Sequence, residues 1–121
     1  MNIATGKRSE MSTDSLMIAK QNIRSYEFCG ICVRTVYSDD QIWMVFADVC
    51  KVLHYVNPNH QVKYIPDEER KKVDILAKNG LVNAINLGGL RRICVLSTAD
   101  NAMGFLKWAE AKKIFDDYDG R

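Results

Sequence analysis

The spacing of apolar residues changes near residue 46, and this change constrains the fold more than any other feature of the sequence. From Ile31 to Tyr37, the side chains alternate with a period of two, which is the pattern of a half-buried strand. From Phe46 to Leu53, apolar residues recur at the spacing of one helix face. Asn57-Pro58 then ends that helix, because proline has no amide hydrogen to donate. The sequence therefore predicts strands that are followed at once by a helix.

Further strands are indicated on both sides of this junction. The first three are expected to form a meander, with turns at Gly30 and at 38–41. Gly88-Gly89 is expected to be another turn, placed before a strand that begins at Arg92. The predicted strands are 23–28, 31–37, 42–45, 72–76, 81–85 and 92–96.

Two more helices are predicted after the first. A short one is expected from about Pro58 to Tyr64. Ser97 precedes Asp100 by capping-box spacing, and this pair is expected to open a helix with Phe105 on its apolar face. Residues 110–118 continue that helix or begin another. The predicted fold class is α+β, with a small antiparallel sheet packed against three or more short helices.

Length and composition limit the organisation and the surroundings of the chain. A chain of 121 residues allows one domain, and we divide it into a flexible N-terminal arm (1–20) and a folded domain (21–121). The longest strongly apolar run, 42–47, is far too short to span a membrane, and the N-terminus lacks a signal-peptide pattern. We therefore expect an intracellular protein with reduced cysteines and no membrane contact.

Positive charge is concentrated in the second half of the chain. The whole sequence has a formal net charge of +2, but residues 61–113 contain ten basic and six acidic side chains. Gly88-Gly89 precedes Arg91-Arg92, and glycines followed by arginines suit phosphate, although a hairpin turn with solvated arginines is an equal interpretation. Basic clusters are more often solvated faces than binding sites. The candidate nucleic-acid contacts are Lys63, Arg70, Lys71, Lys72, Arg91 and Arg92.

The cysteines and histidines give weak evidence for chemistry. Cys29 and Cys32 form a CxxC pair inside a strand pattern, without a second pair to complete a zinc site. We therefore favour buried, apolar thiols over redox or metal function. His54 and His60 have no obvious nucleophile or carboxylate partner. We expect no enzymatic activity, no catalytic residue, no metal and no cofactor.

Several segments together resemble the N-terminal domain of the Bro proteins and phage antirepressors (Bro-N). The resemblance rests on F-x-G and V-R around Phe28 to Arg34, and on a W…D-V…V-L-x-Y-x-N-P stretch from Trp43 to Pro58. D-E-E at 67–69, G-G-x-R at 88–91 and an E-A-K helix at 110–112 follow in the same order. Departures include His54 where the family usually has glycine, Ala109 in place of proline and a divergent C-terminal end.

The resemblance implies a regulatory module encoded by a virus or prophage. The first hypothesis is DNA binding through the basic face, and the alternative is an antirepressor-like inhibitor that binds a phage repressor or a host protein. Tyr55 and Trp108, with Val56 and Phe105, are the candidate protein contacts for this alternative. A thiol or histidine enzyme ranks last, and a homodimer is left open. The implied location is the host cytoplasm, with the nucleoid for a phage or the host nucleus for a eukaryotic virus.

Overall fold

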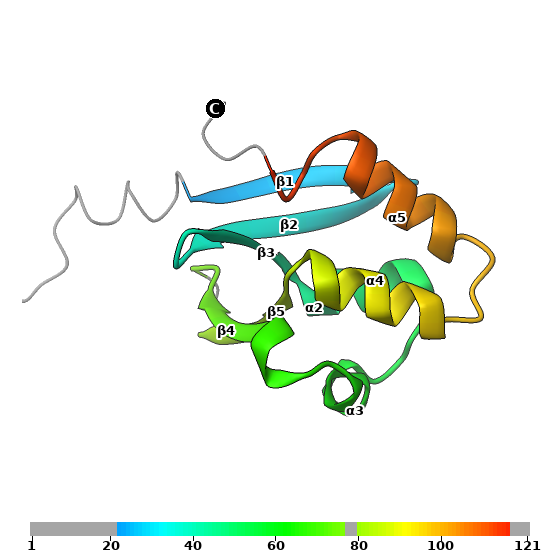
Figure 1. The fold of residues 1–121 in the computed structure, drawn as a ribbon, viewed down its shortest axis with the longest axis horizontal. Helices are drawn as coiled ribbons and strands as arrows, with labels where there is room; N and C mark the ends of the chain where they lie inside the picture. The colour runs from blue at the N-terminus through cyan, green and yellow to red at the C-terminus, as the bar shows by residue number, and fades with distance from the viewer. Residues whose placement is uncertain (1–21, 77–79, 117–121) are drawn as a thin grey trace, which may run out of the picture.

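The computed structural model describes residues 22–76 and 80–116, and within them it confirms the α+β class. A single five-stranded sheet has the order β1-β2-β3-β5-β4, and all neighbouring strands are antiparallel. Its strands are β1 (Ile23–Phe28), β2 (Ile31–Ser38), β3 (Gln41–Val45), β4 (Arg70–Asp74) and β5 (Leu81–Ile85). Figure 1 shows the first three strands stacked beside one another, with β4 and β5 continuing the sheet.

Two tight turns form the meander as predicted. Cys29 (φ 50°) and Gly30 (φ 81°) connect β1 to β2, and Asp39 (φ 52°) and Asp40 (φ 63°) connect β2 to β3. Two-residue hairpins prefer positive φ at both positions because that geometry matches the twist of the strands. Asparagine, aspartate and glycine tolerate this region best, so Cys29 is the least expected residue in these turns.

The helices are mostly short, and the first of them begins without a connecting loop. They are α2 (Phe46–Leu53), α3 (Pro58–Gln61), η1 (Val62–Tyr64), η2 (Asp67–Glu69), α4 (Leu87–Leu96) and α5 (Ala102–Ala111). α2 follows Val45 directly and ends at His54, which has a left-handed backbone with φ 65°. That conformation favours glycine, which accounts for the glycine that the Bro-N pattern usually has here. Among the described residues, no helix combines the length and apolar character that a membrane span requires.

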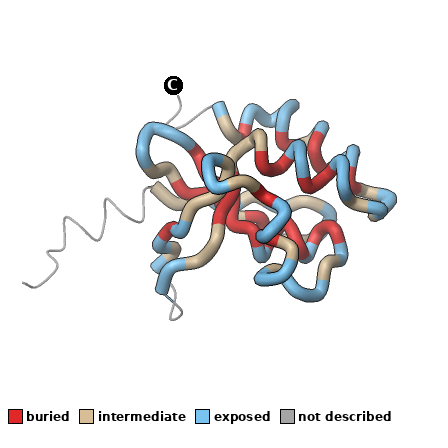
Figure 2. Tube along the Cα trace, turned by 60° about the horizontal axis from the view of Figure 1, so that its bottom comes forward, coloured by how far each residue is buried: buried red, intermediate tan, exposed pale blue. Residues whose placement is uncertain are grey.

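The main core lies between one face of the sheet and three of the helices. Val33, Met44 and Ile85 supply the strand side of this core, and residues of α2, α4 and α5 supply the other. Figure 2 shows buried and exposed positions alternating along the helices, as amphipathic packing requires. The opposite face of the sheet carries a smaller cluster of Val36, Trp43, Val73 and Ala84. Trp43 is therefore a core residue.

The largest error of the sequence prediction concerns residues 87–96. The predicted Gly88-Gly89 turn and the predicted strand 92–96 are both wrong, because these residues form helix α4. Asn86 caps this helix by accepting a hydrogen bond from the Gly89 amide on its side-chain oxygen (3.0 Å). A hairpin loop that could hold phosphate is consequently not present at 88–92.

Smaller corrections concern the ends of neighbouring elements. The capping box is wrong: the Ser97 hydroxyl accepts from the amide of Ala99, and α5 begins only at Ala102, after Asn101. The strand predicted at 72–76 begins two residues earlier, at Arg70. The predicted arm, 1–20, and the last part of the 110–118 prediction lie outside the described residues.

Candidate functional site: a groove beside helix α4

Helix α4 approaches the rest of the molecule closely at its first turn. A methyl group on Gly89 would lie 2.9 Å from Cβ of Ile85 and 3.0 Å from the carbonyl oxygen of Glu69. The Asn86 amide donates to that same carbonyl (3.1 Å). Only glycine fits at position 89, so Gly89 serves the close packing of a helix against a strand rather than a turn.

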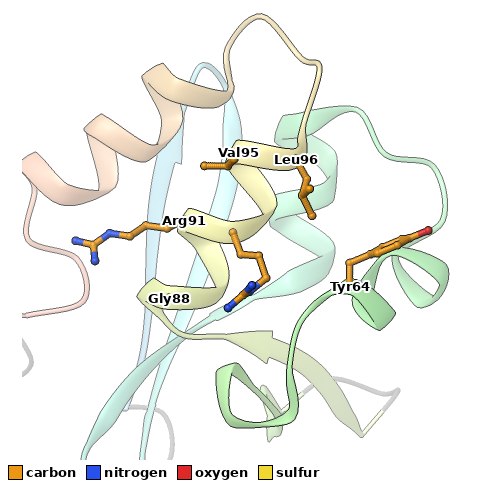
Figure 3. A pocket seen from close by; sticks show the side chains of 6 residues that line it. Tyr64, Gly88, Arg91, Val95 and Leu96 are labelled. Carbon is orange, nitrogen blue, oxygen red and sulfur yellow. The ribbon is translucent and has the colours of Figure 1, made fainter.

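The outer face of α4 leaves large apolar side chains in solvent. Val95 is 72% exposed, Leu96 is 54% exposed, and Tyr64 on the neighbouring η1 is 53% exposed. These residues, with Gly88, Arg91 and Arg92, line a mainly apolar hollow of about 470 Å³, which we call the α4 groove. In Figure 3, Leu96 lies on the side of α4 that faces Tyr64, and Arg91 points to the other side.

Both arginines of the groove are engaged in ion pairs. Arg92 donates from Nε and Nη2 to the two carboxylate oxygens of Glu69, at 2.8 and 3.0 Å. This two-point pairing lowers the pKa of Glu69 and raises that of Arg92, because each hydrogen bond favours the charged form of its partner. Arg91 donates from Nε to Glu110 on α5 at 3.0 Å. The side chain of Arg91 remains 58% exposed, and that of Arg92 remains 45% exposed.

The structure does not bring the six predicted basic contacts onto one surface. Arg91 is directed toward α5, and Arg92 toward the end of η2. Arg70 donates to Asp67 (2.5 Å) and to the carbonyl of Ile65. Lys71 pairs with Asp39 at the β2–β3 turn, on the opposite face of the sheet from Arg70, since strand neighbours alternate.

Lys63 and Lys72 differ from the other four basic candidates. Both are exposed, and in the part of the chain that the structure describes neither makes an ion pair. Lys63 lies on η1 beside Tyr64, and Lys72 lies on the edge strand β4. The predicted basic face is thus divided between partly neutralised arginines and two separate lysines.

The predicted protein contacts lie mostly against the core. Trp108 is half-buried and packs on Phe28, with ring centroids 5.1 Å apart, and Phe105 is fully buried. Tyr55 is also half-buried against the main core, whereas Val56 is 99% exposed. Phe105 is therefore excluded from any surface patch. The sequence analysis missed Val95, Leu96 and Tyr64. A helical assignment of 87–96 would have placed Val95 and Leu96 on an outer face, whereas no sequence pattern singles out Tyr64 on η1.

The cysteines divide into two classes. Cys50 and Cys94 are buried, and burial raises the pKa of each thiol to about 12, so neither forms a thiolate at neutral pH. Cys29 and Cys32 are exposed, so the expectation that the thiols of this pair are buried is wrong. His54 and His60 are exposed as well. No group of three or more cysteine, histidine or acidic side chains suited to a metal occurs within residues 22–76 and 80–116.

A buried carboxylate joins the sheet to the first helix. Asp48, whose side chain is 2% exposed, accepts hydrogen bonds from the backbone amide, Nε and Nη2 of Arg34 at 2.9, 2.9 and 2.8 Å. β3 pairs with β2 only as far as Thr35, so the carboxylate replaces the strand partner that the Arg34 amide lacks. The same contact raises the pKa of Arg34. The V-R and D-V elements of the Bro-N pattern are therefore one structural unit.

Comparison with family models identifies the family of this chain. Neither the comparison with curated proteins nor that with solved structures found a significant match. A family model described as "BRO family, N-terminal domain" matches residues 32–115, which span the chain from β2 to the turn after α5. Modules of this family are associated with regulatory roles of DNA-binding and antirepressor-like kinds. The match covers more than half of the sequence and includes both halves of the Arg34–Asp48 unit, and the chain belongs to the BRO family through its N-terminal domain.

Proposed function

We propose that this chain is a virus- or prophage-encoded regulatory module that acts by binding another protein at the α4 groove, as an antirepressor-like inhibitor does. The observation that carries the proposal is the exposed apolar face of α4. Val95 and Leu96 together with Tyr64 expose three large apolar side chains around one hollow. Contiguous apolar surface rimmed by charged groups is typical of protein interfaces.

The distribution of charge favours the same interpretation. Four of the six predicted phosphate contacts already face carboxylates, and Lys71 and Arg91 point in different directions. DNA binding gains most of its affinity from a continuous set of free cations. A divided basic surface therefore supports a protein partner over DNA.

Site-specific photocross-linking tests the proposal. A photoreactive amino acid at Leu96 is expected to capture a discrete protein in cells that express the chain from its native context. The same group at Lys107, an exposed position on α5, is the matched control and should not capture that protein. Equal capture from both positions, or capture that survives Val95→Ser with Tyr64→Ser, would contradict binding at the groove.

DNA binding is the second candidate, and a specific observation supports it. Lys63 and Lys72 are exposed without ion pairs in the described ranges, and exposed ion pairs such as Arg70–Asp67 contribute only about 0–1 kcal/mol, so the arginine can turn to a phosphate. A mobility-shift series on duplex DNA from about 50 to 200 mM salt tests this candidate. Binding that weakens steeply with salt and is lost in Lys63→Ala with Lys72→Ala would favour DNA. Absence of a mobility shift at the lowest salt concentration would exclude DNA binding as a candidate function.

Neither candidate requires a catalytic step, and we propose that the chain acts by binding alone. The triple variant Cys29→Ser, Cys32→Ser, His54→Ala removes the exposed thiols and the histidine that an enzyme hypothesis would use. Cross-linking from Leu96 should be unchanged in this variant. Loss of the cross-linked product without unfolding would mean that one of these side chains contributes to binding, which contradicts binding at the α4 groove alone.

A further inference from the structure

We propose that the occupant of the α4 groove is an amphipathic helix whose apolar side chains are flanked by carboxylates. This inference rests on the proposed function and specifies the chemistry of the partner. It follows from three properties of the groove: its length, its apolar surface and the sign of its charge.

The length of the groove suits a helix rather than a single side chain. Gly88, Arg91, Arg92, Val95 and Leu96 line it at intervals of three, one, three and one residue, so they form one stripe along α4. Eight residues of helix correspond to about 12 Å, or a little more than two turns. A partner helix lying along this stripe would place two of its residues, one turn apart, over the apolar part.

The apolar surface is placed to receive those two residues. Leu96 on α4 and Tyr64 on η1 lie on the two sides of the hollow, and Gly88 has no side chain to obstruct its far end (Figure 3). Val95 extends the apolar surface on the side of Arg91. A leucine-sized side chain between Leu96 and Tyr64 would be removed from water together with these two side chains. The central residues of protein interfaces act in this way.

The charge of the groove selects acidic residues beside the apolar ones. Among the described residues that line it, two are arginines and none is acidic, while Glu110 pairs with Arg91 and Glu69 with Arg92 from outside the lining. Arg92 uses Nε and Nη2 for Glu69, which fixes the guanidinium, and Nη1 has no hydrogen-bond partner among the described residues and can donate to a second carboxylate. Within the described residues, Arg91 uses only Nε, for Glu110, so its two terminal nitrogens have no partner there and can donate to a carboxylate of another molecule. Lys63 precedes Tyr64 on η1 and is an exposed cation.

The same features disfavour the other occupants. A two-fold contact between copies of this chain through the middle of α4 would oppose Arg91 and Arg92 to their own counterparts. A nucleic acid would place phosphates near the arginines but would leave Val95 and Leu96 without apolar contacts of matching shape. An acidic amphipathic helix satisfies both the arginines and the apolar side chains.

Three synthetic peptides test the inference directly on the full chain. Each is a helix-forming peptide of about fifteen residues. The first carries two leucines four positions apart, flanked by glutamates. The second replaces the glutamates by lysines, and the third replaces the leucines by serines. We expect saturable binding of the first peptide by fluorescence anisotropy, at least tenfold weaker binding of the second, and loss of binding by the third.

Variants of the chain assign that binding to the groove. Leu96→Ser should weaken binding of the acidic peptide at least tenfold, and Lys107→Ser on α5 should leave that binding unchanged. A pair-swapped variant, with Arg91→Glu and Glu110→Arg together with Arg92→Glu and Glu69→Arg, retains both ion pairs in reversed order. It should prefer the lysine peptide over the glutamate peptide, which a merely damaged fold would not do.

The outcomes separate this inference from the function on which it rests. Equal affinity for the acidic and basic peptides, or unchanged binding in Leu96→Ser, overturns the acidic-helix inference. If cross-linking from Leu96 still captures a protein in that case, the proposed function stands and only the partner's chemistry is wrong. If Leu96 captures nothing while the acidic peptide binds as expected, the groove's preference stands and the proposed role in the cell fails. Self-association by sedimentation, lost in Leu96→Ser, would instead assign the groove to a second copy.

Discussion

The two faces of helix α4 carry similar residues in opposite surroundings. On the inner face, Leu90 and Ile93 are completely buried and Cys94 is 2% exposed. On the outer face, Val95 and Leu96 are among the most exposed large apolar residues of the described chain. The inner face builds the core, whereas the outer face contributes nothing comparable to folding. An exposed apolar patch that folding does not need is better explained by an interaction outside the chain.

The reactivity of the thiols should give the largest difference between buried and exposed positions. With a thiol pKa near 12, Cys94 forms about a thousandfold less thiolate than an ordinary cysteine with a pKa near 9. Cys50 shares this value, while Cys29 and Cys32 are exposed. A chromogenic disulfide reagent at pH 8 should therefore label two thiols quickly and two only as the protein unfolds. Equal labelling rates for all four thiols in the native protein would show that the inner face of α4 opens readily to solvent.

Truncation of a side chain should reduce the stability of the protein much more on the inner face of α4 than on its outer face. Ile93→Ala is expected to lower the free energy of unfolding by about 2–5 kcal/mol, because it leaves a cavity in the core. Leu96→Ala should change it by about 0.5 kcal/mol or less, because Leu96 is already half in solvent. Urea denaturation measures both values. A comparable loss of unfolding free energy in the two variants would mean that the outer face of α4 is buried in the native protein.

The adjacent glycines of α4 give a finer comparison. Gly89→Ala should destabilise the protein by about 1–3 kcal/mol, because its methyl group meets the Glu69 backbone and Cβ of Ile85. In Gly88→Ala the nearest atom is the Glu69 side-chain oxygen at 3.2 Å, which can move away. The gain in helix propensity, about 1 kcal/mol, should offset that adjustment. Thermal unfolding of the two variants side by side decides whether Gly89 alone is essential for the stability of the fold.

The ion pair at the groove should produce the smallest effect. The pKa of Glu69 is lowered in the folded protein. The ion pair with Arg92 therefore stabilises the fold at pH values above the ordinary glutamate pKa, and this contribution is lost as the pH falls through the lowered pKa of Glu69. The stability of the native protein should therefore drop more steeply below about pH 4.5 than that of Glu69→Gln. Parallel curves for the two proteins would mean that Glu69 and Arg92 are not paired in solution.

Local patterns predicted most of the sheet and the first helix. The meander, α2 and β5 depend on alternation, turn residues and a proline, all of which act between near neighbours in sequence. Helix α4 was predicted as a strand because its outer face is apolar. With Val95 and Leu96 beside Ile93 and Cys94, residues 93–96 form a continuous apolar run, and periodicity alone cannot distinguish such a run from a buried strand.

The candidate site was harder to predict than the fold for a related reason. The ion pairs of Arg91 and Arg92 join residues 19 and 23 positions apart, and sequence spacing does not indicate such pairs. The basic residues were therefore counted as free, although most of them face carboxylates. The exposed position of Val95 and Leu96 became apparent only with the correct secondary structure.

The direct junction of β3 and α2 also has a consequence for how the length of this chain can vary. Val45 belongs to the strand and Phe46 to the helix, so no connecting residue can absorb an insertion. One added residue would turn the helix by about 100° and carry Asp48 away from Arg34. Homologous chains should thus accept insertions and deletions in the loop between α4 and α5 but keep an invariant count of residues from Val45 to Asp48.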